Sequence, residues 1–248
     1  MNHACTTTSD EGLEAIIEEI LASESWDEAS LDRIQRRHPK DGRGFFNKRE
    51  ILARFRARGR GDEALFSERL RTCPTRSVSG VLPVTVLTKP FPCPGRCVFC
   101  PSDVRMPKSY LSNEAVCQRA EANRFDPYLQ AWGRLQAYRD MGHPTEKVEL
   151  IVLGGTWSHY PVDYRRWFVK RLFEALNDFG AGRDRRDAVL RFAPDFRREA
   201  AAEAVRGKYN RHVGRVLREA RESAAWERCA PSELERVQRE NEGAVSRC

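Results

Sequence analysis

Apolar residues in the first third of the chain recur every three or four positions, the spacing of amphipathic helices. In the first of these helices the apolar positions alternate with an acidic face. The pattern predicts helices over residues 9–22, 28–37, 47–58 and 62–71. Few apolar residues lie outside these stripes, so we expect a helical region with little core of its own.

Two of these helices carry start signals. Thr8 and Glu11 have the spacing of a capping box, and so do Asn47 and Glu50. In a capping box the side chains of the two residues satisfy backbone amides that the first turn leaves unpaired. The sequence therefore predicts helix starts at these positions.

The pattern changes at Ser77. Two apolar, β-branched runs at 81–88 and 147–153 predict buried strands. A helical stretch between them, over 114–141, is interrupted near Asp126, and another helix is expected over 162–178. Strand, helix, strand, helix is the order of a βαβ unit, which predicts a parallel sheet and an α/β fold.

The last part of the chain has only helical patterns. We expect one helix from about 195 to 226 and another from Pro231 to the end. Ser232 and Glu235 have the spacing of a capping box for the last helix.

Charge is unevenly distributed. Residues 1–32 hold nine acidic residues and no Lys or Arg, whereas residues 33–60 hold eleven Lys or Arg and two acids. Basic clusters of this kind favour nucleic acid binding, because they displace counterions from phosphates. A solvated helix face explains the same charges, and charge alone does not separate these two interpretations.

The sequence carries neither a membrane span nor a secretory signal, so we expect a cytoplasmic protein. It has eight cysteines, and three of them lie in one short loop, Cys93-Pro-Gly-Arg-Cys97-Val-Phe-Cys100. In a reducing compartment such crowding indicates metal or redox chemistry rather than disulfides.

The loop follows the first predicted strand directly. Three soft thiolates suit an iron–sulfur cluster, and they leave one iron of a 4Fe-4S cluster open for S-adenosylmethionine. Phe99, between the second and third cysteines, can pack against adenine. The alternatives are a zinc site that recruits a fourth ligand and three free thiols.

A second motif, Leu153-Gly154-Gly155-Thr156, ends the second predicted strand. Ligands of parallel α/β folds bind at the carboxyl ends of strands, and glycines there let the backbone approach a ligand closely. Alone, a glycine pair is more often a turn; one βα unit after the cysteine loop, it indicates a cofactor site.

Several stretches resemble the radical S-adenosylmethionine (radical SAM) part of the Elongator catalytic subunit, the third Elongator protein, in its bacterial stand-alone form. The similar stretches are Arg76–Val81, Leu87–Pro101, Met106–Tyr110, Arg124–Tyr128 and Gly142–Thr156. The resemblance extends from about residue 33 to the end.

The resemblance implies an enzyme that makes 5-carboxymethyluridine at the tRNA wobble position. It implies a 4Fe-4S cluster, S-adenosylmethionine and the co-substrate acetyl-CoA. The implied partners are tRNA and either other Elongator-type subunits or a second copy of the chain. No membrane partner is expected.

The resemblance also assigns residues. It implies cluster ligands (Cys93, Cys97 and Cys100) and cofactor contacts (Phe99, Gly154, Gly155 and Thr156). It implies tRNA contacts in the basic helices: Arg43, Lys48, Arg49, Arg54, Arg56 and Arg58. Lys89, Lys108 and Tyr110 are candidates for substrate contact, with an exposed lysine or a packed tyrosine as the alternative; His143 and His159 are expected to be loop residues without a catalytic role.

One departure from the family is visible. The family's six-stranded partial (β/α) barrel is followed by an acetyltransferase-like domain, whereas this chain stops at Cys248, where the third strand is expected to begin. We therefore expect a helical tRNA-binding region over 1–76 and an incomplete radical SAM barrel over 77–248. A tRNA-binding iron–sulfur or zinc module without turnover remains the alternative function.

Overall fold

The computed structural model describes residues 4–95, 97–193, 209–223 and 229–248. The chain forms two compact units. One comprises residues 1–80 and 136–144, and the other comprises residues 81–135 and 145–248. The division of the chain at residue 76 into a tRNA-binding region and a cluster-bearing region stays a prediction.

The first unit is helical, as expected. Its helices are α1 (Ala4–Ala22), α2 (Ser30–Arg37), α3 (Lys48–Arg58) and α4 (Glu63–Leu70). Contrary to expectation they share a core, in which Ile16, Ile17 and Ile20 are fully buried and the rings of Phe55 and Phe66 stack. The expectation of little core was wrong because each stripe is short, and only packing shows that the stripes meet.

The two predicted capping boxes have different outcomes. The Asn47 side-chain Oδ1 accepts from the Arg49 backbone amide at 3.0 Å, and the Glu50 carboxylate accepts from the Asn47 backbone amide at 2.9 Å, which confirms the second box. The first is wrong, because α1 begins at Ala4 and Thr8 lies inside it. No glycine or proline precedes Thr8 to stop the helix there.

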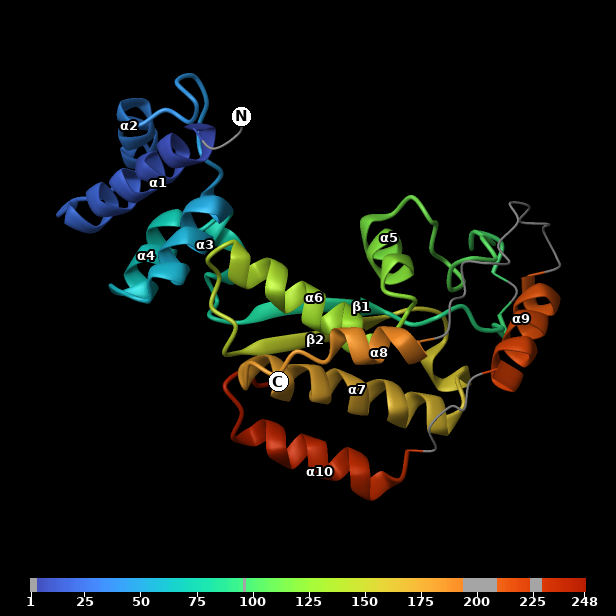
Figure 1. Ribbon diagram of the computed structural model, residues 1–248. Coiled ribbons are helices and arrows are strands. Elements are labelled where there is room, and N and C mark those ends of the chain that lie inside the picture. The colour runs from blue at the N-terminus through green and yellow to red at the C-terminus, as the bar shows by residue number, and fades with distance from the viewer. Residues whose placement is uncertain (1–3, 96, 194–208, 224–228) are drawn as a thin grey trace. The chain divides into compact units, whose positions relative to one another are not determined.

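The second unit contains both strands (Figure 1). Short 3₁₀ turns lie at Pro74–Ser77, in the first unit, and at Trp157–His159. The other elements are β1 (Leu82–Leu87), α5 (Ala115–Ala122), α6 (Pro127–Asp140, whose last turns belong to the first unit), β2 (Val148–Leu153), α7 (Val162–Gly180), α8 (Arg186–Phe192), α9 (Tyr209–Ser223) and α10 (Pro231–Glu242).

The strands pair in parallel, from Leu82 opposite Val148 to Leu87 opposite Leu153, which confirms the βαβ unit. β1 is largely buried, whereas β2 is more exposed than expected. Arg247 pairs in parallel with the other edge of β2, where it accepts from the Val148 amide at 2.7 Å. The described residues thus form a mixed α/β fold with a two-stranded sheet, and a partial barrel stays a prediction.

The C-terminal helices differ from expectation. Residues 195–208 and 224–226 of the expected helix 195–226 lie outside the described residues, and α9 lies within its range. The short, charged α8 was not predicted. α10 ends at Glu242, before Gly243, and its start is held by Glu233, which accepts from the Ala230 amide, rather than by Ser232 and Glu235.

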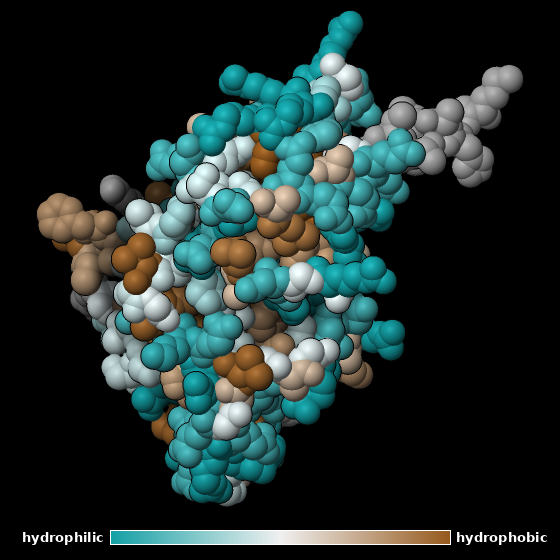
Figure 2. Space-filling model, turned by 90° about the vertical axis from the view of Figure 1, so that its left-hand side faces the viewer, coloured by the Kyte–Doolittle hydropathy of each residue, from teal (hydrophilic) through white to brown (hydrophobic). Residues whose placement is uncertain are grey.

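The face of the molecule drawn in Figure 2 is predominantly polar. Its apolar residues lie in small separate spots. In the part of the chain that the structure describes, we find no helix with the length and apolar character needed to cross a bilayer.

Candidate functional site

The cysteine loop begins at the carboxyl end of β1. Cys97 is exposed, Cys93 and Cys100 are half-buried, and none of the three forms a disulfide. A side-chain carbon at Gly95 would lie 3.5 Å from the Cys97 Sγ and 3.6 Å from the Cys93 Sγ. The bare Gly95 backbone thus lies between two thiols, as expected of a loop that wraps a metal group.

Two hydroxyl groups contact these thiols. The Cys93 Sγ lies 3.7 Å from the Thr156 Oγ1, and the Cys100 Sγ lies 2.9 Å from the Ser109 Oγ. Thr156 follows β2, so the cysteine loop and the Gly-Gly motif lie next to each other. Ser109 was not predicted; its φ of +84° is unusual for a residue with a side chain, and no sequence signal marks it.

Gly154 is required by its surroundings. A side chain at this position would overlap the Thr88 hydroxyl at the end of β1. The Gly154 backbone also forms a hydrogen bond with Tyr110. Burial raises the pKa of Tyr110, and this hydrogen bond partly offsets the rise. The structure therefore places the predicted residue Tyr110 on Gly154, two positions before Thr156, which lies next to Cys93.

Tyr160 joins the two strand ends and was not predicted. Its hydroxyl lies 2.8 Å from the Thr88 Oγ1 and donates to the Lys89 carbonyl oxygen at 3.0 Å. Burial raises the pKa of Tyr160 to about 12, so the hydroxyl keeps its proton at neutral pH. Only the fold could identify it, since nothing in the sequence distinguishes it from the neighbouring Tyr164.

The predicted lysines lie against aromatic rings. Lys89 is buried, and its Nζ lies 4.6 Å from the centre of the Tyr164 ring. Lys108 hydrogen-bonds Ser102 and lies 5.0 Å from the centre of the Tyr209 ring. These cation–π contacts are consistent with structural roles, whereas substrate contact by either lysine stays a prediction.

Phe99 is fully exposed, and the structure does not bring it to the other predicted residues. Within the described residues, no group of three His, Cys, Asp or Glu side chains is arranged to hold a metal ion. The donor set still fits a cluster, because three cysteine thiols in one loop, none in a disulfide, are the ligands that iron–sulfur clusters use. Binding requires the loop to draw them together.

The predicted tRNA contacts in the first unit fall into two groups. The three arginines in the second half of α3 have carboxylate partners: the Arg54 Nε lies 2.6 Å from the Glu14 Oε1, Arg58 pairs with Glu14 and Glu18, and Arg56 pairs with Glu63. Arg43 and Arg49 are exposed and Lys48 is half-buried, and no ion pair involves these three within the described residues. The acidic helix α1 therefore compensates part of the basic charge.

The two histidines also differ. His143 is buried, and its Nδ1 lies 2.9 Å from the Ser77 Oγ, so it contributes to the packing of the first unit. The His159 ring lies edge-on to Phe91, 6.0 Å between centres, just beyond the Gly-Gly motif.

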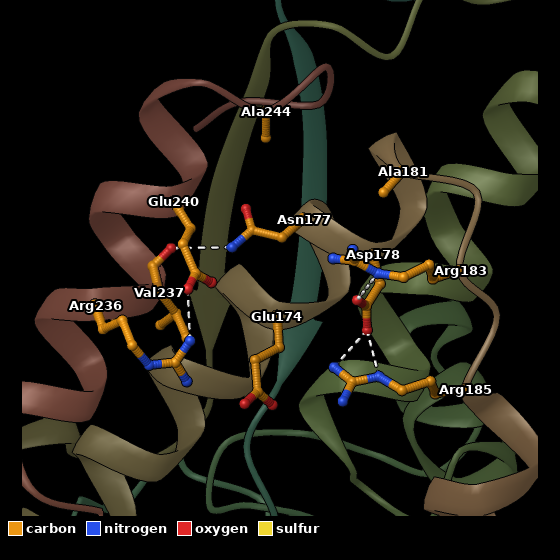
Figure 3. A pocket seen from close by; sticks show the side chains of 10 residues that line it. All are labelled: Glu174, Asn177, Asp178, Ala181, Arg183, Arg185, Arg236, Val237, Glu240 and Ala244. Atoms are coloured by element: carbon orange, nitrogen blue, oxygen red, sulfur yellow. Dashed lines mark hydrogen bonds and ion pairs between the residues drawn. The ribbon is translucent and has the colours of Figure 1, made fainter.

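A cavity of about 640 Å³ lies elsewhere, between α7, α10 and the turn at 181–185 (Figure 3). Its charged groups satisfy one another: Arg183 and Arg185 both bind Asp178, and Arg236 binds Glu240. Because cations and anions are matched, the cavity has no evident preference for a charged ligand.

Comparison with known proteins identifies relatives of the chain. A tRNA uridine(34) acetyltransferase of Dehalococcoides mccartyi is 44% identical over 108 residues, which are 44% of this chain and 24% of that protein. The enzyme of the same name from Methanocaldococcus infernus is 42% identical over 115 residues, 44% of this chain and 22% of that protein. Elongator complex protein 3 of Schizosaccharomyces pombe is 34% identical over 192 residues, 72% of this chain and 35% of that protein.

The matches thus cover about a third or less of the length of these relatives. No protein-family model matches the chain.

Proposed function

Since the chain is homologous over about half of its length to tRNA uridine(34) acetyltransferases and Elongator complex protein 3, we propose that it is the cluster-bearing part of a radical tRNA-modifying enzyme. The reaction of the whole enzyme is the attachment of an acetyl-derived group to C5 of the wobble uridine, which yields 5-carboxymethyluridine. The substrates are tRNA and acetyl-CoA.

One observation supports the proposal most. The cysteine loop and the Gly-Gly motif, 63 residues apart in sequence at Cys93 and Thr156, meet at the carboxyl ends of two parallel strands. Cys93, Cys97 and Cys100 would hold a 4Fe-4S cluster, which with bound S-adenosylmethionine supplies a carbon radical. Gly154 and Gly155 leave room for the cofactor, with Thr156 beside it.

The other residues have supporting roles. The Tyr160 hydroxyl bonds Thr88 and Lys89 just after β1 and the Gly155 backbone just after β2, so it holds the two strand ends together. Of the three candidates for substrate contact, Tyr110 is favoured, because it hydrogen-bonds the backbone of Gly154 in the Gly-Gly motif. Arg43, Lys48 and Arg49 would bind tRNA phosphates, and Arg54, Arg56 and Arg58 would do so by exchanging their carboxylate partners. Protein partners would be Elongator-type subunits or a second copy of the chain.

A second function is a tRNA-binding iron–sulfur or zinc module without turnover. The described sheet, which has two strands and one further bridge at Arg247, favours it, because an open sheet gives a radical little shielding from water. The two functions share the metal loop and the tRNA-binding surface, and they differ in turnover.

The metal is tested by anaerobic reconstitution of the full chain with iron and sulfide. We expect about four irons per chain and the absorption and paramagnetic resonance spectra of a 4Fe-4S cluster. The C97A variant should lose most of this iron, because two thiolates hold such a cluster poorly. The matched control is C73S, which removes an exposed cysteine outside the loop. Stoichiometric zinc without a cluster signal would refute the radical proposal.

Turnover is tested by incubating the reduced, reconstituted chain with S-adenosylmethionine and tRNA. We expect little 5′-deoxyadenosine from this chain alone, because the described sheet is small. A robust yield that depends on tRNA would instead show that the chain is active by itself and would exclude the second function.

A further inference from the structure

The side-chain carboxamide of Asn210 hydrogen-bonds both the backbone amide and the backbone carbonyl of Cys93. The Cys93 amide donates to the Asn210 Oδ1 at 2.9 Å, and the Asn210 Nδ2 donates to the Cys93 carbonyl oxygen at 2.9 Å. The two residues are 117 positions apart in the sequence. Only a carboxamide side chain offers a donor and an acceptor in this arrangement, so Asn210 pairs with Cys93 as a neighbouring strand would.

The sequence around Cys93 suits this pairing. Pro92 and Pro94 flank it, so the Cys93 amide is the only backbone donor among the three residues. A residue before proline is also biased toward extended backbone, which can accept such a neighbour. The single free donor at this point of the loop is therefore the one that Asn210 binds.

Helix α9, which carries Asn210, is docked against the same loop (Figure 1). Tyr209, Val213 and Leu217 form one buried stripe, and Phe91 and Val104 pack on it. The Tyr209 hydroxyl also donates to the Met106 carbonyl oxygen at 2.8 Å. Residues on both sides of the cysteine loop thus hold the helix, which fixes the position of the Asn210 side chain.

A second carboxamide holds the start of the same segment. The Leu87 amide donates to the Gln130 Oε1 at 2.9 Å, and the Gln130 Nε2 donates to the Leu87 carbonyl oxygen at 3.0 Å. Between the Gln130 pair at Leu87 and the Asn210 pair at Cys93, the Tyr160 hydroxyl donates to the Lys89 carbonyl oxygen. In contrast, Val98 and Phe99 are 86% and 100% exposed. The segment from Leu87 to Cys93 is held by side chains, whereas the part of the loop beyond Gly95 is open to solvent.

We propose that Asn210 is a positioning residue that presets Cys93, the first thiol of the loop, as the fixed ligand onto which Cys97 and Cys100 close. The proposal rests on the proposed function, since it concerns the same metal site. An anchor that is already ordered lowers the conformational entropy lost when the metal closes the loop. Asn210 acts through the Cys93 backbone and needs no contact with the metal.

The test compares the full-length wild type with N210A and with N210D, which is isosteric but cannot donate to the Cys93 carbonyl. R211A, an exposed neighbour on α9, is the control. The first readout is hydrogen exchange in the reduced, metal-free chain, where a fragment spanning Pro92–Pro94 reports the Cys93 amide alone. We expect exchange to be about tenfold faster in N210A, with the Val213 amide unchanged, because the clamp is local.

The second readout is iron per chain after reconstitution with limiting iron. We expect at least a twofold loss in N210A and N210D and none in R211A. Unchanged exchange at Cys93, or equal loss of protection at Cys93 and Val213, would overturn the proposal; the latter would show that Asn210 only docks α9. Unchanged iron in both variants would also overturn it. If the wild type itself takes up no iron, the proposed function fails, whereas the exchange readout still decides whether Asn210 clamps Cys93.

Discussion

Gly154 shows how one residue position joins the two strands to the candidate site. Its φ is +151°, and the Thr88 side chain occupies the space that a Cβ would need. Thr88 in turn hydrogen-bonds Tyr160, so a change at Gly154 reaches the residues that hold both strand ends. The neighbouring Gly155 is less constrained, because a Cβ there would make an ordinary 3.7 Å contact with the Tyr160 hydroxyl.

We therefore expect G154A to destabilise the chain by about 2 kcal/mol, the usual cost of forcing a group into a packed site. Urea unfolding followed by circular dichroism measures this change. G155A is the matched control and should lie within about 0.5 kcal/mol of the wild type. Equal stability of the two variants would show that Thr88 moves aside without cost.

Among the elements, α1 and α3 place an acidic face against a basic one. The pairs of Glu14 with Arg54 and Arg58 are partly exposed, and exposed ion pairs of this kind contribute little stability. Their larger effect is on binding, because a phosphate must displace Glu14 before it reaches either arginine. A phosphate can reach Arg43 and Arg49 without displacing a carboxylate, because these two residues have no such partners in the part of the chain that the structure describes.

Reversal of Arg43, Lys48 and Arg49 to Glu should therefore weaken tRNA binding more than reversal of Arg54 and Arg58. We expect the salt dependence of the association constant to flatten by roughly 2 to 3 in log–log slope, about 0.7 to 0.9 for each of the three lost phosphate contacts. Fluorescence anisotropy with labelled tRNA over a range of salt concentrations measures it. R236E, on α10 in the second unit, is the control, and an unchanged slope in the triple variant would mean that these residues are only solvated.

Glu19 makes the packing of α1 on α2 sensitive to acid. Hydrogen bonds from Arg37 and then from His38 hold the pKa of Glu19 below its usual value of 4.5. A carboxylate with a lowered pKa stabilises the fold above its unfolded pKa, and that stabilisation is lost as the pH falls through the folded pKa.

We expect E19Q to be less stable than the wild type at pH 7 and to lose less stability than the wild type as the pH falls below about 4.5. Thermal unfolding over a pH series checks this. E24Q, whose carboxyl belongs to an exposed residue just after α1, is the control. Parallel stability curves for E19Q and the wild type would contradict the assignment.

At the scale of the whole chain, the C-terminal residues are tied to the sheet. The buried Asn241 donates to the Asn177 Oδ1 at 2.7 Å and to the Ser246 carbonyl oxygen at 2.9 Å, and its Oδ1 accepts from the Cys248 amide at 2.9 Å. These bonds hold Arg247 against the edge of β2 that β1 leaves open.

The N241A variant should free this segment, and the Val148 amide, which donates to Arg247, should exchange about tenfold faster with solvent. Amide exchange read by mass spectrometry or NMR measures it. R239A, an exposed position on the same helix, is the control. Unchanged exchange at Val148 would show that strand pairing alone holds the segment.

Most elements were predictable because their signals are local. Apolar spacing predicted both strands and, in the described residues, every α-helix except α8, and the order of elements predicted the parallel pairing of the strands. α8 was missed because it is short and charged, and the first capping box failed because nothing stops α1 at Thr8. The core of the first unit was underestimated because it is assembled from several short stripes.

The sequence by itself determined the chemistry of the candidate site, since three thiols at close spacing and a glycine pair after a strand are local patterns. Only the tertiary structure decided which groups surround that chemistry. It placed Asn210 on Cys93, Tyr160 at both strand ends, Lys89 against an aromatic ring and Glu14 on the basic helix. The physical reason is distance along the chain: these contacts join residues far apart in sequence, and no local pattern encodes them.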